Sequence, residues 1–108
     1  MAENPLKILF LSAEAVPFAK VGGLADVAGS LPKALRALGH DVRLMIPRYG
    51  TISSDDFDLE KIGEPFRVPA GAGKEYVHLI GTTLEEVPVY LLWNEHYFTS
   101  REKVYGFE

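Results

Sequence analysis

The most informative absence in this sequence is cysteine. None of the 108 residues is a cysteine, so disulfides and thiolate metal sites are excluded. Long apolar runs are also missing, because the run at residues 7–12 is far too short to span a membrane. Residues 1–7 are polar and do not resemble a signal peptide. We therefore expect a cytoplasmic protein without a membrane partner; a plastid protein that has lost its transit peptide is the alternative.

Clustered positive charge is the second feature that the sequence lacks. The 11 Lys and Arg residues are scattered among 15 Asp and Glu residues, and the net charge is −4. Because nucleic-acid binding requires clustered Lys and Arg, we expect no nucleic-acid partner. The three histidines, His40, His78 and His96, have no metal-site spacing. The dinucleotide-binding fingerprint and the Walker A loop are absent as well.

The first half of the chain predicts a βαβ unit. The continuous apolar run at residues 7–12 is typical of a strand buried on both faces of a parallel sheet. A helix is predicted from Leu24 to Leu38, kinked or split at Pro32 and ended by Gly39. Residues 41–47 form the second strand, and a right-handed crossover should connect the two. The apolar residues that give the helical spacing are Leu24, Val27, Ala28, Leu31, Leu35 and Leu38.

The second half predicts additional strands beside this unit. After an irregular polar loop at residues 48–58, strand patterns occur at residues 64–68, 75–83 and 87–93, and residues 95–98 suggest a short helical turn. The expected fold class is therefore α/β, a βαβ core with an added β-hairpin or meander. Only two strands clearly belong to a parallel sheet, so we expect a truncated domain. Such a piece should expose an apolar face or strand edge and self-associate.

The segment most suggestive of ligand binding is the loop between the first strand and the helix. Ligands of open α/β sheets gather at the carboxyl ends of strands, and a helix N-terminus favours anions. Gly22 and Gly23 allow the backbone to approach a ligand and to adopt positive φ, and Lys20 adds a positive charge. These features suit a sugar diphosphate. The alternative is that the glycines only turn the chain and Lys20 is solvated.

Asp26, in the first turn of the predicted helix, also has two interpretations. A carboxylate there interacts favourably with the helix dipole. As a ligand-binding group it would repel a diphosphate, so it would have to accept hydrogen bonds from sugar hydroxyls.

A longer ordered pattern resembles a known family. Residues 20–27, Lys-Val-Gly-Gly-Leu-Ala-Asp-Val, are similar to the Lys-x-Gly-Gly-Leu-Ala-Asp-Val signature of ADP-glucose-dependent glycogen and starch synthases. The Ser-Ala-Glu at residues 12–14, Leu-Pro-Lys-Ala-Leu at 31–35 and Gly-His-Asp-Val at 39–42 also resemble this family. The resemblance is strong over residues 6–50, looser over 51–98, and returns weakly at 105–106.

The resemblance implies a retaining glucosyltransferase with two Rossmann-like domains and the donor in the cleft between them. Such enzymes transfer glucose from ADP-glucose to the non-reducing 4-hydroxyl of an α-1,4-glucan, without a metal or cofactor. Residues 1–108 would be a truncated N-terminal, glucan-acceptor side of the catalytic domain, lacking the C-terminal nucleotide-sugar domain and inactive without the remainder of the same chain.

By the same resemblance, no complete catalytic set is present, and the substrate-binding residues are carried over one by one. Lys20, Gly22 and Gly23 would lie against the glucosyl diphosphate, Asp26 would help to bind the donor, and Tyr105 would lie near the cleft.

Two other functions remain open from sequence. One is a stand-alone α-glucan-binding module, in which aromatic side chains form a platform on which glucan rings stack. The platform would consist of Tyr90, Trp93, Tyr97 and Phe98. The other function is a generic sugar-nucleotide-binding domain of a different family.

Overall fold

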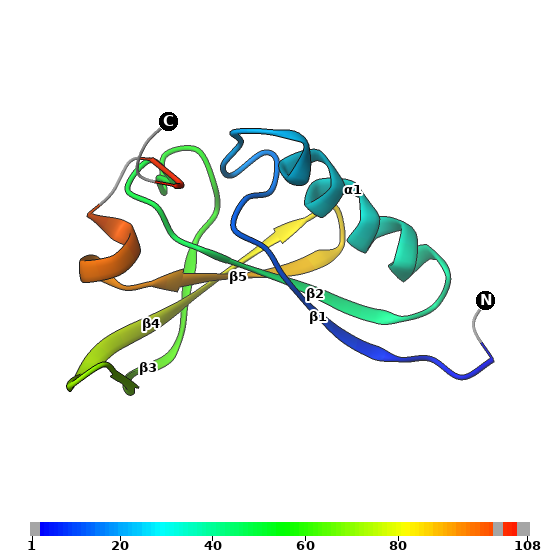
Figure 1. Ribbon diagram of the computed structural model, residues 1–108. Helices are drawn as coiled ribbons and strands as arrows, with labels where there is room; N and C mark the ends of the chain where they lie inside the picture. Colours follow the sequence, from blue (N-terminus) through cyan, green and yellow to red (C-terminus); the bar gives the residue numbers. More distant parts are fainter. Residues whose placement is uncertain (1–2, 101–102, 106–108) are drawn as a thin grey trace.

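The computed structural model describes residues 3–100 and 103–105 and contains one long helix, five strands and one short helical segment within them (Figure 1). In chain order the elements are β1 (Lys7–Leu11), α1 (Gly23–Ala37), β2 (Asp41–Pro47), β3 (Glu60–Ala70), β4 (Gly73–Leu84), β5 (Val87–Trp93) and the π-helical segment η1 (Glu95–Thr99). Every predicted strand is present, and β3 extends well beyond its predicted ends.

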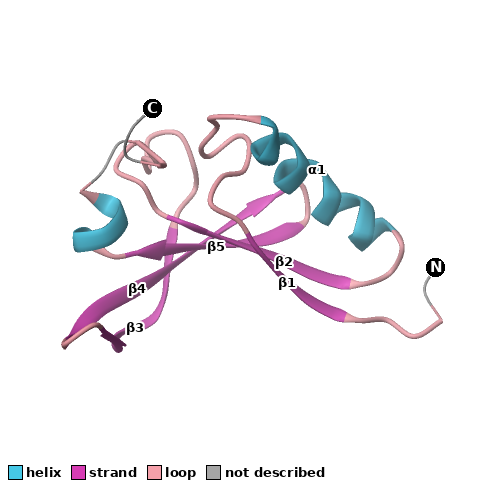
Figure 2. Ribbon diagram, viewed as in Figure 1, coloured by secondary structure: helices cyan, strands magenta, loops and turns pink. Residues whose placement is uncertain are grey.

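A single five-stranded sheet with the order β1-β2-β5-β4-β3 forms the framework (Figure 2). β1, β2 and β5 are parallel, whereas β4 is antiparallel to both β5 and β3. The predicted βαβ unit (β1, α1, β2) and the added meander (β3, β4, β5) are both confirmed. The meander's last strand, β5, lies beside β2 and becomes a third parallel strand, which the sequence pattern did not indicate.

The core lies between α1 and one face of the central strands. Leu44 and Ile46 of β2 are fully buried beside Val89 and Leu91 of β5, to which they are paired in register. Alternate residues of a strand share one face, so this face of β2 and β5 meets the helix, as Figure 1 shows. Loop residues close the core beyond the strand ends; the buried ones are Ala15, Phe18, Tyr49 and Ile52.

The helix differs from its prediction in two respects. It runs unbroken through Pro32, so of the two predicted effects, a kink or a split, the split is wrong. Burial of this proline offsets the hydrogen bond that it cannot donate. Of the predicted apolar stripe Ala28 is buried, but most of its larger members are exposed, and the buried face consists of small residues. Gly29 shows why, because a Cβ there would lie 2.4 Å from Cγ2 of Val16. The small residues on the buried face are Ala25, Ala28, Gly29 and Pro32.

The expectation that the first strand is buried on both faces is also wrong. β1 occupies the edge of the sheet and pairs with β2 alone, while α1 packs on β2 and β5. Leu9 and Leu11 are consequently 53% and 67% exposed. Apolar residues along one side of α1 are exposed as well: Leu24, Val27, Leu31 and Leu38. The described residues thus include the exposed apolar surface that was expected, on both β1 and α1.

Candidate functional site

The loop of residues 12–22 starts at the carboxyl end of β1 and leads into α1. Three of its hydrogen bonds, two from backbone N–H groups and one from a side chain, hold it in place. Ser12 N–H donates to the carbonyl of Met45 (3.1 Å), and Val16 N–H donates to the carbonyl of Ala25 (3.0 Å). The hydroxyl of Tyr49 donates to the carbonyl of Ala13 at 2.6 Å. The loop therefore has a defined path at the edge where ligands of parallel sheets are found.

Gly22 and Gly23 are exposed at the point where α1 begins. Gly22 is the N-cap residue with φ −146°, and Gly23 is the first helical residue. Neither has positive φ, so that part of the expectation is wrong. A Cβ on Gly23 would meet nothing within 4 Å, and one on Gly22 would approach only Oε1 of Glu14, at 3.9 Å. Neither backbone conformation nor packing within the described residues requires glycine here.

Lys20 and Asp26 form an ion pair across the start of the helix. The ammonium of Lys20 donates to both carboxylate oxygens of Asp26, at 2.9 and 2.8 Å. Both side chains are about half exposed, at 52% and 57%. Such an exposed pair contributes about 0–1 kcal/mol. It is therefore weak enough to be rearranged by a ligand.

Glu14 is a residue of this site that the sequence analysis missed. It is buried, and its carboxylate accepts backbone N–H bonds from Gly22 and Ala25, both at 3.0 Å, and from Val21 at 3.3 Å. Its signal in the sequence is the acidic residue of the Ser-Ala-Glu segment at residues 12–14, in the loop that follows the apolar strand. Its partners lie up to 11 residues further along the chain.

A hollow of about 380 Å³ lies at the carboxyl ends of the parallel strands. It adjoins the loop through Ser12 and Ala13, and its lining is predominantly apolar. The lining residues are Leu11, Ser12, Ala13, Met45, Ile46, Pro47 and Leu92. This hollow, the exposed glycines and the Lys20–Asp26 pair together form the candidate site.

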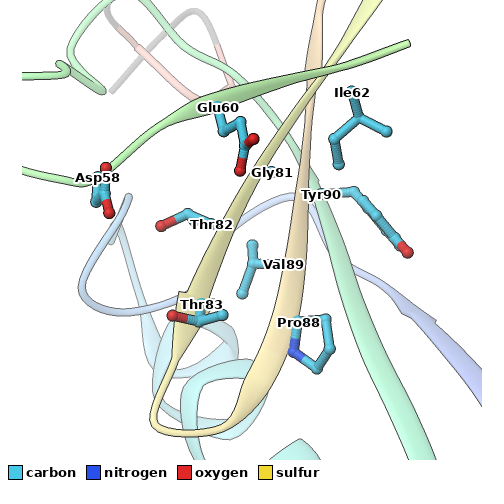
Figure 3. Close-up of a pocket in the computed structure, with 9 residues that line it drawn as sticks. All are labelled: Asp58, Glu60, Ile62, Gly81, Thr82, Thr83, Pro88, Val89 and Tyr90. Carbon is cyan, nitrogen blue, oxygen red and sulfur yellow. The ribbon is translucent and has the colours of Figure 1, made fainter.

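A second hollow, of about 350 Å³, is formed around the meander and the loop that precedes it. Figure 3 shows Asp58, Glu60, Thr82, Thr83 and Tyr90 among its lining side chains. Both carboxylates are exposed, and none of its lining residues belongs to the Gly22–Gly23 loop. It is therefore separate from the candidate site.

The predicted aromatic platform does not form with all four of its residues. Tyr90 and Trp93 are three residues apart on β5 and therefore face opposite sides of the sheet. Tyr90 hydroxyl contacts Arg43, whereas Trp93 packs against the core and lies beneath the guanidinium of Arg48 at 4.9 Å. Strand geometry thus separates Tyr90 from Trp93, and the part of the platform made of Trp93, Tyr97 and Phe98 stays a prediction.

Tyr105 is 43% exposed, and its neighbour Val104 packs against the core cluster. Its predicted place near a cleft stays a prediction.

Residues 3–100 and 103–105 contain neither a membrane-spanning helix nor a metal-binding cluster. The helices of this part lack the length and hydrophobicity that a transmembrane span requires. Its His, Asp and Glu residues form no group of three or more that could hold a metal ion.

The fold and the loop define a class. It is that of Rossmann-like α/β domains, here with a glycine-containing loop after the first strand, at the sheet edge where such domains bind ligands. The sequence model described as the starch synthase catalytic domain matches residues 7–108. The chain therefore belongs to the starch synthase catalytic domain family.

Curated relatives support the same family. The glycogen synthase of Geotalea daltonii is 45% identical over 101 residues, and that of Caldicellulosiruptor saccharolyticus is 48% identical over 102. Each match covers 94% of this chain but 21% of the relative. The chain therefore spans about a fifth of the length of these relatives.

A solved structure agrees with the fold. The catalytic domain of starch synthase IV from Arabidopsis thaliana, bound to ADP and acarbose, superposes with a TM-score of 0.85 at 30% identity. The match covers 97% of this chain and 22% of that one. It confirms the predicted Rossmann-like fold.

Proposed function

We propose that this chain provides one side of the donor site of a retaining glucosyltransferase, which transfers glucose from ADP-glucose to the non-reducing 4-hydroxyl of an α-1,4-glucan. Membership of the starch synthase family supports the reaction class. The observation that carries the site is the exposed Gly22–Gly23 backbone at the start of α1. Since the described structure does not itself require glycine there, close approach of a ligand explains the missing side chains.

In this proposal Lys20 faces the diphosphate of the donor. Negative charge develops on the leaving ADP as the glycosidic bond breaks, and a preorganised cation lowers the energy of that state. Lys20 pairs with Asp26 at 2.8 Å in the described structure, and this exposed pair is weak enough for the ammonium to turn to the diphosphate when the donor binds. Asp26 then accepts hydrogen bonds from sugar hydroxyls. ADP-glucose is a substrate, and the reaction uses no metal or cofactor, as the family resemblance implies.

The rest of the active site belongs to chain that is absent from these 108 residues. We place residues 1–108 on the N-terminal, glucan-acceptor side, with a C-terminal nucleotide-sugar domain across the cleft. The chain's partners are then ADP-glucose, the α-1,4-glucan and the remainder of its own polypeptide, in the cytoplasm. The coverage of about a fifth of the relatives supports this arrangement. The 108-residue chain alone should show no glucosyl transfer.

A chimaera tests the proposal. Residues 7–108 replace the matching segment of the Geotalea daltonii glycogen synthase, and incorporation of glucose into glycogen is measured with ADP-glucose and, in parallel, UDP-glucose. We expect transfer with ADP-glucose and a loss of about 100-fold in kcat/KM for Lys20→Ala. The matched control is Lys74→Ala, which removes an exposed lysine of β4. A folded but inactive chimaera, or equal activity of the two variants, would contradict the proposal.

A further inference from the structure

Glu14 is the only buried side chain among the charged residues that the structure describes, at 1% exposure. A buried carboxylate is unfavourable unless hydrogen bonds compensate for its lost hydration. Here the compensation comes from the backbone alone. Oε1 accepts the N–H groups of Gly22 and Ala25, and Oε2 accepts that of Val21. The ion pairs found within the described residues do not include Glu14.

The position of these donors indicates what the carboxylate does. Gly22 is the N-cap of α1 and has no side chain with which to cap it. Ala25 is the third residue after the N-cap, and its N–H is one of the two that an N-cap side chain ordinarily bonds. Glu14, in the loop that follows β1, takes over that role. Its negative charge also lies at the positive end of the helix.

This arrangement decides which groups of the loop are left for a ligand. The N–H groups of Gly22 and Ala25 point at Glu14 and are not available to a phosphate. Ligand contacts must then come from the exposed Lys20 and from the exposed backbone around Gly23. One buried carboxylate therefore fixes the shape of residues 21–25 and determines which face of the loop a ligand meets.

We infer that Glu14 is a positioning residue for the sugar-nucleotide donor: it holds the Gly22–Gly23 loop in its binding shape and does not itself touch the substrate. The first half of this inference concerns the loop and stands without any enzymatic activity. The second half, the effect on donor binding, rests on the proposed function. Two measurements keep the halves apart.

The structural half is tested by hydrogen exchange with mass spectrometry on the 108-residue chain. Glu14→Gln keeps the size of the side chain but removes its charge and one acceptor oxygen. We expect peptides covering residues 21–25 to exchange about tenfold faster, while peptides from β2 and β5 stay unchanged. The matched control, Glu64→Gln, changes an exposed carboxylate of β3 and should leave all rates as in the parent.

Unchanged protection of residues 21–25 in Glu14→Gln would overturn the capping role. If that variant does not fold, Glu14→Asp is measured instead. It keeps the charge but withdraws the carboxylate by about 1.5 Å, so the same peptides should lose protection.

The kinetic half is tested in the chimaera by varying ADP-glucose and glycogen separately. Glu14→Gln should raise KM for ADP-glucose about tenfold or more and leave KM for glycogen within about twofold. A merely structural role would reduce the active fraction, and thus kcat, with both KM values unchanged; that result would overturn the inference. If the parent chimaera is active and Glu14→Gln behaves like Glu64→Gln, the inference fails while the proposed function stands. If the parent chimaera is inactive, the proposed function fails, and hydrogen exchange still decides whether Glu14 caps α1.

Discussion

The substitution Gly23→Ala tests whether the glycine at this position is required for folding or for ligand binding. Gly23 is the first residue of α1, its φ is not positive, and a Cβ there would meet nothing within 4 Å. Alanine is favoured over glycine in a helix by about 1 kcal/mol in the interior, and by less in the first turn. The free energy of unfolding should therefore stay the same or rise by up to about 1 kcal/mol.

The effect on the donor should have the opposite sign. The added methyl group occupies the exposed face of the loop, where we propose that the glucosyl diphosphate approaches the backbone. Losing one hydrogen bond to a charged group costs about 1.5–3 kcal/mol, which corresponds to a factor of roughly 10 to 150 in affinity. We expect KM for ADP-glucose in the chimaera to rise by that factor.

The assay combines a urea melt of the variant with steady-state kinetics of the chimaera. Gly73→Ala is the matched control, because a Cβ there also meets nothing within 4 Å and the residue lies at the start of β4, outside the candidate site. The reasoning is refuted if Gly23→Ala leaves KM for ADP-glucose within about twofold of the parent. It is equally refuted if the variant loses stability, because glycine would then serve the fold.

Three further predictions concern the framework of the site. Gly29→Ala should destabilise the chain by about 1–3 kcal/mol in urea unfolding, because the new Cβ would lie 2.4 Å from Val16; an unchanged midpoint would show that the helix moves away freely. Tyr49→Phe removes the 2.6 Å bond to Ala13 and should cost about 1 kcal/mol in thermal unfolding, a value that an unaltered melting temperature would contradict. Leu11→Lys, at a side chain 67% exposed on the edge strand, should reduce self-association in sedimentation velocity; identical sedimentation of parent and variant would place the contact elsewhere.

The fold was largely predictable because its signals are local. A continuous apolar run predicted β1, and the spacing of turns predicted the meander. The burial of these elements was not predictable in the same way. Leu9 looks like a core residue in sequence but lies on an edge strand. On α1, Ala28 and Gly29 occupy core-facing positions, whereas most of the leucines are exposed. Which apolar face is covered depends on strand order and close helix packing, and neither is encoded in a single periodic pattern.

The candidate site shows the same division between local and long-range information. The order strand, glycine pair, helix places Gly22 and Gly23 correctly from sequence alone. Glu14 was missed because its role depends on bonds to residues 8 and 11 positions away. The Lys20–Asp26 pair was missed as a contact for the same reason, although both residues were selected individually. The sequence alone predicts which residues are candidates for the site and where the chain turns. The hydrogen-bond partners of a buried charge depend on the three-dimensional path of the loop, which the sequence pattern does not show.

The charges of the loop bear on how the proposed donor site could hold a diphosphate. Two carboxylates, Glu14 and Asp26, and one ammonium, Lys20, lie at the start of α1. The helix contributes about half a positive charge, and Glu14 already uses the backbone donors at Gly22 and Ala25. The local balance is therefore close to neutral or slightly negative, which is unfavourable for holding a diphosphate. If the proposed donor is correct, further cations must come from outside this loop, and the loop's own contribution is shape and one lysine rather than net charge.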